Sequence, residues 1–139
     1  MFSIGYAQEI FTPPVGVGLA GYFNARPNEG MYDDLYVKAL IIESKGKKIG
    51  FLAFDLLSLV QPLFDELEKQ ITQKFGKDFH DGLILSATHT HTGPGFPRTA
   101  EALANANANI KYAFEQVVSA AMRALERAVM NLQPGELEV

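Results

Sequence analysis

The chain of 139 residues carries 12 basic and 16 acidic side chains, three histidines and no cysteine, for a net charge of −4. Hydrophobic residues make up 47% of the chain and charged residues 20%, which is typical of a globular domain and excludes a disordered or membrane-embedded segment. The acidic balance and the lack of a basic run exclude a nucleic-acid partner, and the lack of cysteine excludes disulfide and thiol chemistry.

The size is that of one domain, residues 1–139, long enough to bury a core. No apolar stretch approaches the roughly 18–20 residues that span a bilayer, so no transmembrane segment is predicted. Residues 1–6 have neither a basic region nor a long apolar segment, so no signal peptide is predicted and a cytoplasmic location is expected.

The first half of the chain predicts short strands and a long loop. Residues 1–34 are rich in glycine, proline and aromatic residues, with a short strand expected at 3–7. β-Type runs at 36–43 and 48–54 flank a short polar turn, which favours an antiparallel hairpin. The second of these runs is apolar on both faces, as expected of a central strand that is covered on both sides.

An amphipathic helix is predicted to follow the hairpin. Pro62 suits the first position of a helix, with Ser58 or Gln61 as its cap. Apolar side chains then repeat at every fourth position as far as Phe75, and Gly76 suits the end of the helix.

The remaining chain predicts a strand, a long helix and the start of another strand. Residues 83–87 are the strand, so strand, helix and strand form a βαβ unit with parallel strands. A long apolar stripe predicts a helix over about residues 109–131, and residues 137–139 resemble a strand that has just begun. Together the elements predict the α/β class: a mixed β-sheet with a β-hairpin and a βαβ unit, and helices packed against the sheet.

The most informative motif follows the strand at 83–87 and places two of the three histidines, His89 and His91, two residues apart. In an extended backbone such residues point to the same side, so both imidazoles are expected to face one direction. Two imidazoles at the end of a buried strand are a common way to bind zinc or a similar metal. The alternative is a pair of surface histidines in a turn.

Asp55 ends the strand at 48–54, and in a parallel pair the carboxyl ends of both strands open on one crevice. Asp55 is therefore expected near the histidines, as a metal ligand or as the carboxylate that orients an imidazole. The alternative is that Asp55 caps the turn or helix that follows. His80 precedes the strand at 83–87, so we expect it in a solvated loop at the opposite end of that strand from His89.

Gly16, Gly18 and Gly21 have the GxGxxG spacing of a dinucleotide-binding loop. That motif needs a strand before it and a helix after it, so that a pyrophosphate sits on the helix N-terminus. Here two prolines precede it, and Pro27 would break a helix barely begun. A nucleotide site is therefore not predicted.

The run Ser-Ala-Thr-His-Thr-His-Thr-Gly-Pro-Gly closely resembles the signature of the neutral/alkaline, non-lysosomal ceramidase family, in which serine usually occupies the position of Thr92. Further segments resemble that family in the same order along the chain: residues 16–22, 33–40, 54–56 and 132–135. The resemblance covers nearly the whole chain, but only the N-terminal part of the family's longer catalytic domain.

The resemblance implies a zinc-dependent hydrolase that cleaves the N-acyl amide bond of ceramide, or of a related small-molecule or lipid amide, with metal-activated water. It implies that His89 is a zinc ligand, and that His91 contacts the reacting end of the substrate by hydrogen bonding or proton transfer. The family's other ligands, a histidine, a glutamate and a tyrosine, come from later in its chain. The resemblance also implies that the glycines turn the backbone sharply near the active site.

Two other hypotheses remain open. Because at most one of the family's metal ligands lies in these residues, the chain could be a non-catalytic domain that binds a ligand or partner. A weaker possibility is a self-contained metal site built from His89, His91 and Asp55, either within one copy of the chain or completed across a dimer. A truncated sheet would expose an apolar face and an open edge, so a homo-oligomer is expected for the isolated chain.

Overall fold

A computed structural model describes residues 2–136, the side chain of His80 excepted, and it contains one mixed β-sheet. The strand order is β4-β3-β2-β1-β5. The strands are β1 (Phe2–Ile10), β2 (Tyr36–Ser44), β3 (Lys47–Phe54), β4 (Leu83–Ala87) and β5 (Gln133–Gly135). β3 and β4 are parallel and the other neighbours are antiparallel, which confirms the hairpin, the βαβ unit and the predicted fold class.

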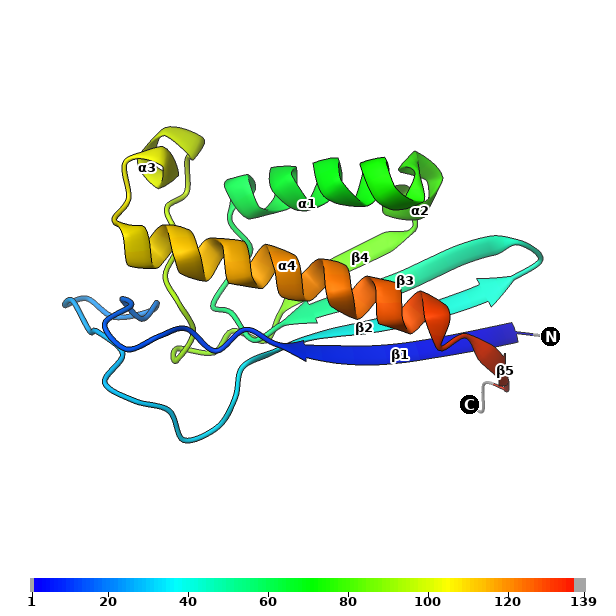
Figure 1. The fold of residues 1–139 in the computed structure, drawn as a ribbon, viewed down its shortest axis with the longest axis horizontal. Coiled ribbons are helices and arrows are strands. Elements are labelled where there is room, and N and C mark those ends of the chain that lie inside the picture. The colour runs from blue at the N-terminus through cyan, green and yellow to red at the C-terminus, as the bar shows by residue number, and fades with distance from the viewer. Residues whose placement is uncertain (1, 137–139) are drawn as a thin grey trace.

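A layer of helices covers one face of the sheet (Figure 1). The two long helices are α1 (Gln61–Phe75) and α4 (Ala108–Met130), and the short ones are α2 (Lys77–Asp81) and α3 (Ala100–Ala104). α4 packs on β1 and β2 and also contacts α1. None of the helices in residues 2–136 is long and apolar enough to cross a bilayer.

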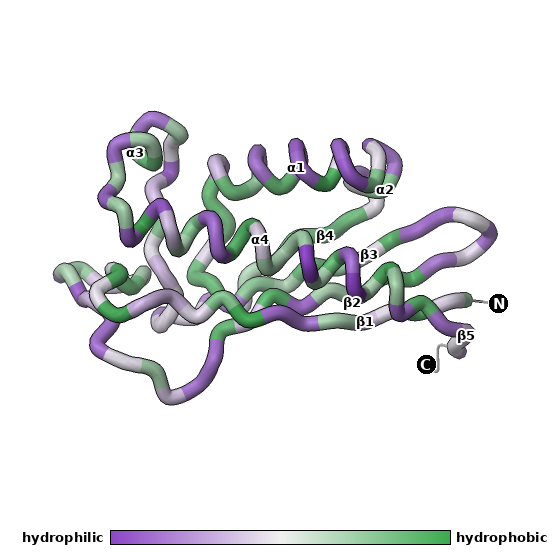
Figure 2. Tube along the Cα trace, viewed as in Figure 1, coloured by the Kyte–Doolittle hydropathy of each residue, from purple (hydrophilic) through white to green (hydrophobic). Residues whose placement is uncertain are grey.

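The core lies between this helical layer and the sheet, as the hydropathy of the trace in Figure 2 also indicates. Every second residue of β2 faces the helices, and Val37, Ala39 and Ile41 are fully buried there. The apolar stripe of α4 meets them, with Val117, Leu125 and other residues fully buried. The period of two in the strand and of 3.6 in the helix thus builds the core predicted from the sequence.

No helix or strand within residues 2–136 covers the other face of the sheet, and here the prediction for β3 is wrong. β3 is a central strand, but only one face of it is covered: Ile49 and Phe51 are 54% and 40% exposed. On the neighbouring β4, Ile84 is 57% exposed. An apolar sequence therefore indicated burial on both faces, although helices cover only one of them.

The observed helix ends differ from the predicted ones in their capping. α1 begins at Gln61 after Val60, which makes no side-chain capping bond, so the predicted cap by Ser58 or Gln61 is wrong. Proline in the first turn explains this, because it removes an amide N–H that a cap would otherwise satisfy. At α4, which begins close to the predicted start, Asn107 Oδ1 accepts a hydrogen bond of 3.0 Å from the amide of Ile110.

Two short helices were not predicted. α2 follows α1 directly after Gly76 and contains His80, so the expectation of a loop there is wrong, while its place at the end of β4 opposite His89 is confirmed. α3 starts at a hydroxyl cap, since Thr99 Oγ1 accepts from the amide of Ala102 at 3.2 Å. Helices of five residues are too short to produce a clear apolar period.

The last described strand, β5, pairs with the start of β1, so the first and last described strands lie side by side at one end of the molecule (Figure 1). The predicted strand at residues 137–139 lies outside the described residues. The opposite end of the molecule carries the loops that follow β1, β3 and β4, and these loops contain the histidine motif.

Candidate metal centre

The histidine motif lies where the parallel strands β3 and β4 end side by side. After β4 ends at Ala87, the amide of Thr88 still donates to the carbonyl of Phe54 at 2.9 Å, and the amide of His89 donates to that of Leu56 at 3.0 Å. The motif is therefore held against the segment that follows β3, at the strand ends where the parallel topology predicts a site.

The backbone at His89 is not extended, contrary to the expectation from the sequence. Its φ is 64°, in the left-handed region, where a side chain with a Cβ costs roughly 1–2 kcal/mol. The imidazoles of His89 and His91 nevertheless lie close, with ring centroids 5.3 Å apart and ring planes at 77°. The two rings converge because of a sharp turn, and backbone strain of this kind is concentrated at functional sites.

A backbone carbonyl holds each imidazole at Nδ1. His89 Nδ1 lies 2.9 Å from the carbonyl oxygen of Leu57, and His91 Nδ1 lies 3.1 Å from that of Gly21. A carbonyl oxygen only accepts hydrogen bonds, so Nδ1 of both rings carries the proton. In the neutral ring Nε2 then has the lone pair, which is the form that binds a metal or accepts a proton.

The glycine-containing loop of residues 16–28 packs directly on the histidine motif. The amide of Ala20 donates to the carbonyl of Gly93 at 3.0 Å, and the amide of Gly95 donates to that of Gly18 at 2.9 Å. The Tyr22 ring meets the His91 ring edge-on at a centroid distance of 5.9 Å. The sequence offered no signal for these contacts beyond the glycine spacing, because they join segments about 70 residues apart.

Asp55 also lies at this end of the sheet, but the hydrogen bonds that the structure gives its carboxylate go to other groups. Oδ2 accepts from the amide of Tyr36 at 2.9 Å, and Oδ1 accepts from the hydroxyl of Thr88 at 3.2 Å. Asp55 thus connects the start of β2 to the residue immediately before His89. Whether it also binds a metal stays a prediction.

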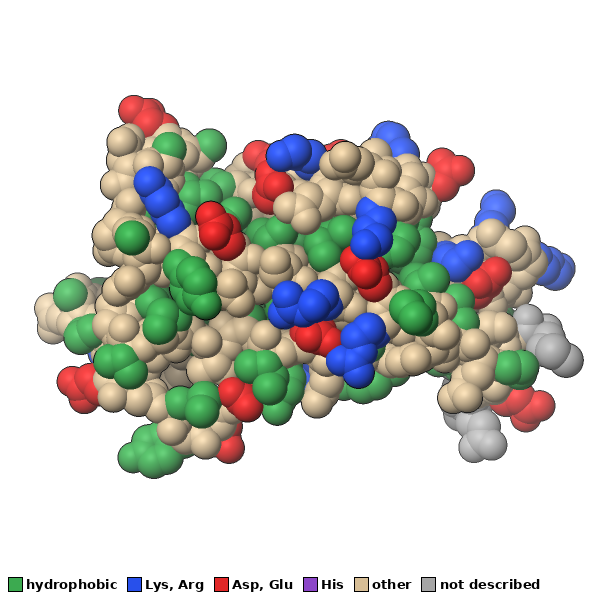
Figure 3. All heavy atoms as spheres, in the orientation of Figure 1, with side chains coloured by type: hydrophobic (Ala, Val, Ile, Leu, Met, Phe, Trp, Pro, Cys, Tyr) green, Lys and Arg blue, Asp and Glu red, His purple; other side chains and the backbone are tan. Residues whose placement is uncertain are grey.

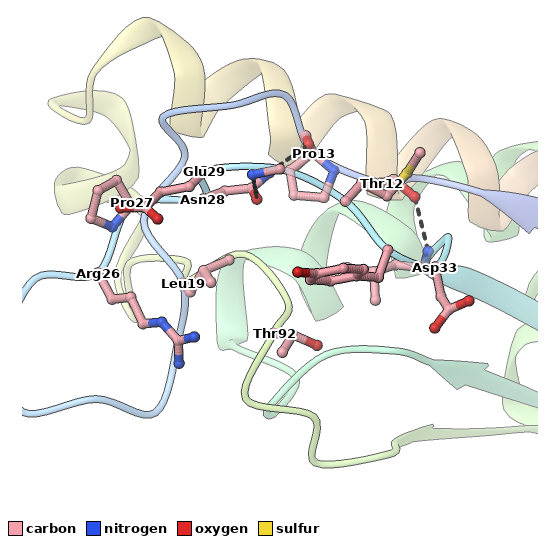
Figure 4. A pocket seen from close by; sticks show the side chains of 13 residues that line it. Thr12, Pro13, Leu19, Arg26, Pro27, Asn28, Glu29, Asp33 and Thr92 are labelled. Atoms are coloured by element: carbon pink, nitrogen blue, oxygen red, sulfur yellow. Dashed lines mark hydrogen bonds between the residues drawn. The ribbon is translucent and has the colours of Figure 1, made fainter.

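A cavity of about 670 Å³ adjoins this site (Figure 4). Arg26 from the glycine-containing loop and Thr92 from the histidine motif both line it, together with Leu19 and the acidic Glu29 and Asp33. The Arg26 guanidinium stacks over the Tyr22 ring at 4.4 Å, so it is fixed beside the histidines. Figure 3 shows hydrophobic side chains on the surface at this end of the molecule. In the loop between β1 and β2, Phe23 and Tyr32 are fully exposed.

The donors present fit a zinc ion in kind but not in number. Imidazole nitrogen is a preferred zinc ligand, and a catalytic site normally has three protein ligands. Within residues 2–136, described side chains of His, Asp and Glu form no group of three or more that could hold a metal ion. The self-contained site of His89, His91 and Asp55 within one copy of the chain is therefore wrong, and the two histidines offer part of a ligand set.

Comparison with known proteins gives the affiliation of the chain. The family described as neutral/alkaline non-lysosomal ceramidase, N-terminal, matches residues 2–139. The chain is 28% identical to the neutral ceramidase of Pseudomonas aeruginosa over 98% of its own length and 21% of that protein. It is 26% identical to neutral ceramidase 3 of Arabidopsis thaliana, of which it spans 18%.

The fold agrees with these sequence matches. The crystal structure of the Pseudomonas aeruginosa neutral ceramidase superposes with a TM-score of 0.83 at 26% identity, over 96% of this chain and 22% of that one. The chain therefore spans about a fifth of the length of its relatives. The match over residues 2–139 and the shared fold show that the chain belongs to the neutral/alkaline non-lysosomal ceramidase family, whose N-terminal portion it matches.

Proposed function

We propose that this chain contributes a metal-binding histidine and a substrate-contacting histidine to a zinc-dependent hydrolase of N-acyl amide bonds. The observation that carries the proposal is the pair of Nδ1–carbonyl hydrogen bonds, which leave Nε2 of His89 and of His91 as lone-pair nitrogens. Membership of the ceramidase family supports ceramide or a related lipid amide as the substrate class.

His89 is the proposed metal ligand. Its ring is held by the Leu57 carbonyl, and its backbone has a left-handed conformation just after β4 ends at Ala87. Ordered support of this kind fixes a ligand's orientation before the metal arrives. The chemistry that zinc supplies when bound at such a site is activation of water and polarisation of the scissile carbonyl.

His91 is the proposed proton-transfer residue. Its Nε2 accepts a proton as water attacks the amide carbonyl, and returns it to the departing amine nitrogen as the carbon–nitrogen bond breaks. Arg26, stacked on Tyr22 beside His91, and Thr92 line the adjoining cavity. We propose that they offer hydrogen bonds to substrate oxygens there.

A second candidate function rests on the incomplete ligand set. Since residues 2–136 contribute no group of three metal-binding side chains, the chain could bind a lipid amide or a partner without turning it over. The hydrolase and the non-catalytic binding domain are distinguished by one observation: whether the protein that carries these residues hydrolyses amides when zinc is bound.

The test is a zinc titration of the protein that carries these residues, followed through the nitrogen signals of its imidazoles, together with its hydrolysis of a short-chain N-acyl amide. We expect zinc to shift Nε2 of His89, and His89→Ala to abolish zinc binding. His91→Ala should retain zinc while turnover falls by roughly 10²–10⁴-fold, the usual contribution of a general acid–base group.

His80→Ala is the matched control, because it removes a histidine from α2 at the opposite end of β4. It should leave both zinc binding and turnover unchanged. Equal loss of zinc in His89→Ala and His91→Ala would overturn the division of roles and make both histidines ligands. Zinc binding that survives both changes would sink the proposed site.

A further inference from the structure

Gly21 lies unusually close to the imidazole of His91. A Cβ atom built on Gly21 would lie 2.7 Å from Cε1 and 2.8 Å from Cγ of that ring, closer than real Cβ contacts come. The ring therefore occupies the space that any other residue at this position would fill. At the same point the carbonyl of Gly21 accepts the hydrogen bond from His91 Nδ1 at 3.1 Å.

Tyr22, the next residue, supplies a wall to the same ring. Its ring stands nearly perpendicular to that of His91, at 88°, with centroids 5.9 Å apart. Edge-to-face geometry of this kind is favourable between ring systems. Arg26 lies over the Tyr22 ring at 4.4 Å and so helps to hold that ring in place.

We propose that Gly21 is a positioning residue for His91: its carbonyl selects the Nδ1–H tautomer, and its missing Cβ leaves the space for the ring beside Tyr22. This inference deepens the proposed function, on which its catalytic meaning rests. Because His91 is exposed, water would otherwise compete for Nδ1 and allow both tautomers. The glycine-containing loop thus decides which nitrogen of His91 faces the substrate.

Gly21 also has a positive φ, which by itself favours glycine. The test must therefore separate backbone strain from the clash between a Cβ atom and the His91 ring. Gly21 has φ 86° and Gly16, in the same loop, has φ 90°. A Cβ on Gly16 would meet only the Asn109 side chain, at an ordinary 3.7 Å. Gly16→Ala therefore carries the same backbone strain as Gly21→Ala without touching an imidazole.

The experiment records long-range proton–nitrogen spectra of the imidazoles in the 139-residue chain without metal, at a pH of about 8, above the ordinary range of imidazole titration. The wild type and Gly16→Ala should both show the Nδ1–H tautomer for His89 and His91. Gly21→Ala should lose the Nδ1–H signal of His91 and keep that of His89. An unchanged His91 signal in Gly21→Ala, or the same loss in Gly16→Ala, would overturn the proposal.

Tyr22 keeps the proposal testable if Gly21→Ala does not fold. Tyr22→Ala should speed solvent exchange of the His91 Nδ1 proton several-fold, whereas Tyr22→Phe, which retains the ring, should not. Equal exchange rates in Tyr22→Ala and Tyr22→Phe would contradict the proposed shielding of His91 by the Tyr22 ring. This readout needs neither zinc nor turnover. A failure of the proposed positioning by Gly21 is therefore distinguishable from a failure of the proposed hydrolysis.

Discussion

At the scale of single residues, the site depends on backbone carbonyls more than on charged groups. His89 and His91 are both fixed through Nδ1 by carbonyl oxygens, of Leu57 and Gly21, from two different loops. This arrangement needs no buried carboxylate, whose desolvation would cost free energy unless it were fully paired. It gives both rings the same tautomer while their Nε2 atoms stay available for chemistry.

Asp55 connects two segments of the chain beside the histidines. Its two carboxylate oxygens hold the Tyr36 amide and the Thr88 hydroxyl, so it fixes the turn that places His89. A metal ligand would instead direct a carboxylate oxygen towards the same point as the imidazoles. The hydrogen bonds favour a role that acts through the backbone.

We predict that Asp55→Asn retains zinc binding with less than about a tenfold loss of affinity, since an amide preserves one acceptor and no ring nitrogen loses its partner. Its unfolding free energy should fall by about 1 kcal/mol, the typical net value of one hydrogen bond. Zinc titration and thermal unfolding measure both quantities.

Thr88→Val is the control, because it removes the same tether and leaves the carboxylate in place. Asp55→Asn and Thr88→Val should show similar zinc affinity and a similar loss of unfolding free energy. Abolished zinc binding in Asp55→Asn, with normal binding in Thr88→Val, would make Asp55 a ligand instead.

At the scale of elements, an ion-pair cluster ties β1 to α4. Glu9 on β1 pairs with Arg123 at 3.1 Å and also with Arg127, one turn further along α4. Figure 3 shows acidic and basic side chains side by side on this face of the molecule. The Glu9 side chain is only 15% exposed, although both arginines are about half exposed or more.

The pKa of Glu9 follows from this placement. Burial by itself would raise the pKa, but hydrogen bonds from Arg127 and Arg123 and their positive charges more than offset it, so the pKa lies below the ordinary value of 4.5. A carboxylate with a lowered pKa stabilises the fold at a pH above its unfolded value. That stabilisation is lost as pH falls through the folded value.

We therefore predict that Glu9→Gln lowers the unfolding free energy at pH 7 by about 1 kcal/mol, at the upper end for exposed ion pairs. The difference from wild type should shrink as pH falls below 4.5 and vanish below the lowered pKa of Glu9. Urea unfolding across this pH range measures it.

Glu29→Gln, in the loop between β1 and β2, removes the same charge from an exposed position and should change the unfolding free energy by less than about 0.5 kcal/mol. A gap between Glu9→Gln and wild type that stayed constant with pH would show that packing, and not the ion pairs, carries the effect.

At the scale of the whole molecule, one face of the sheet stays apolar and open. Strand pairing aligns its side chains in two rows across the sheet. The rows are Tyr6, Leu40, Phe51 and Ile84, and Ile4, Ile42 and Ile49. β4 is an edge strand of this sheet, so the first row runs out to an edge with which another strand can pair.

We predict that the isolated chain associates with a second copy through this face, because apolar rows that reach an open edge favour face and edge contact together. Light scattering should give a mass that rises with concentration. Ile84→Lys, which places a charge in the exposed end of the first row, should return the chain to a monomer.

Ser86→Lys adds the same charge to the same strand and face, in a row that is not apolar, since Ser86 pairs with Ala53 beside Lys38. It should associate nearly as wild type does. A monomeric wild-type chain at high concentration would refute the predicted association.

Periodicity made most elements predictable from the sequence. The strand over Leu83–Ala87 has the predicted bounds, and β2, β3 and the long helices differ from theirs by one or two residues, because apolar spacing reflects burial on one face. The prediction that both faces of β3 are covered was wrong, because an apolar residue indicates hydrophobicity and not the presence of a covering layer. α2 and α3 were not predicted, because a helix of little more than one turn is too short to show an apolar period.

The sequence by itself determined the family signature and the α/β class, and it singled out His89 and His91 as candidate site residues, because these depend on local spacing and residue type. The tertiary structure decided how the histidines are held: the left-handed turn at His89, the Leu57 and Gly21 carbonyls, and the tether through Asp55. Those contacts join segments distant in the chain, and a hydrogen bond to a backbone carbonyl leaves no mark on the identity of the residue that provides it.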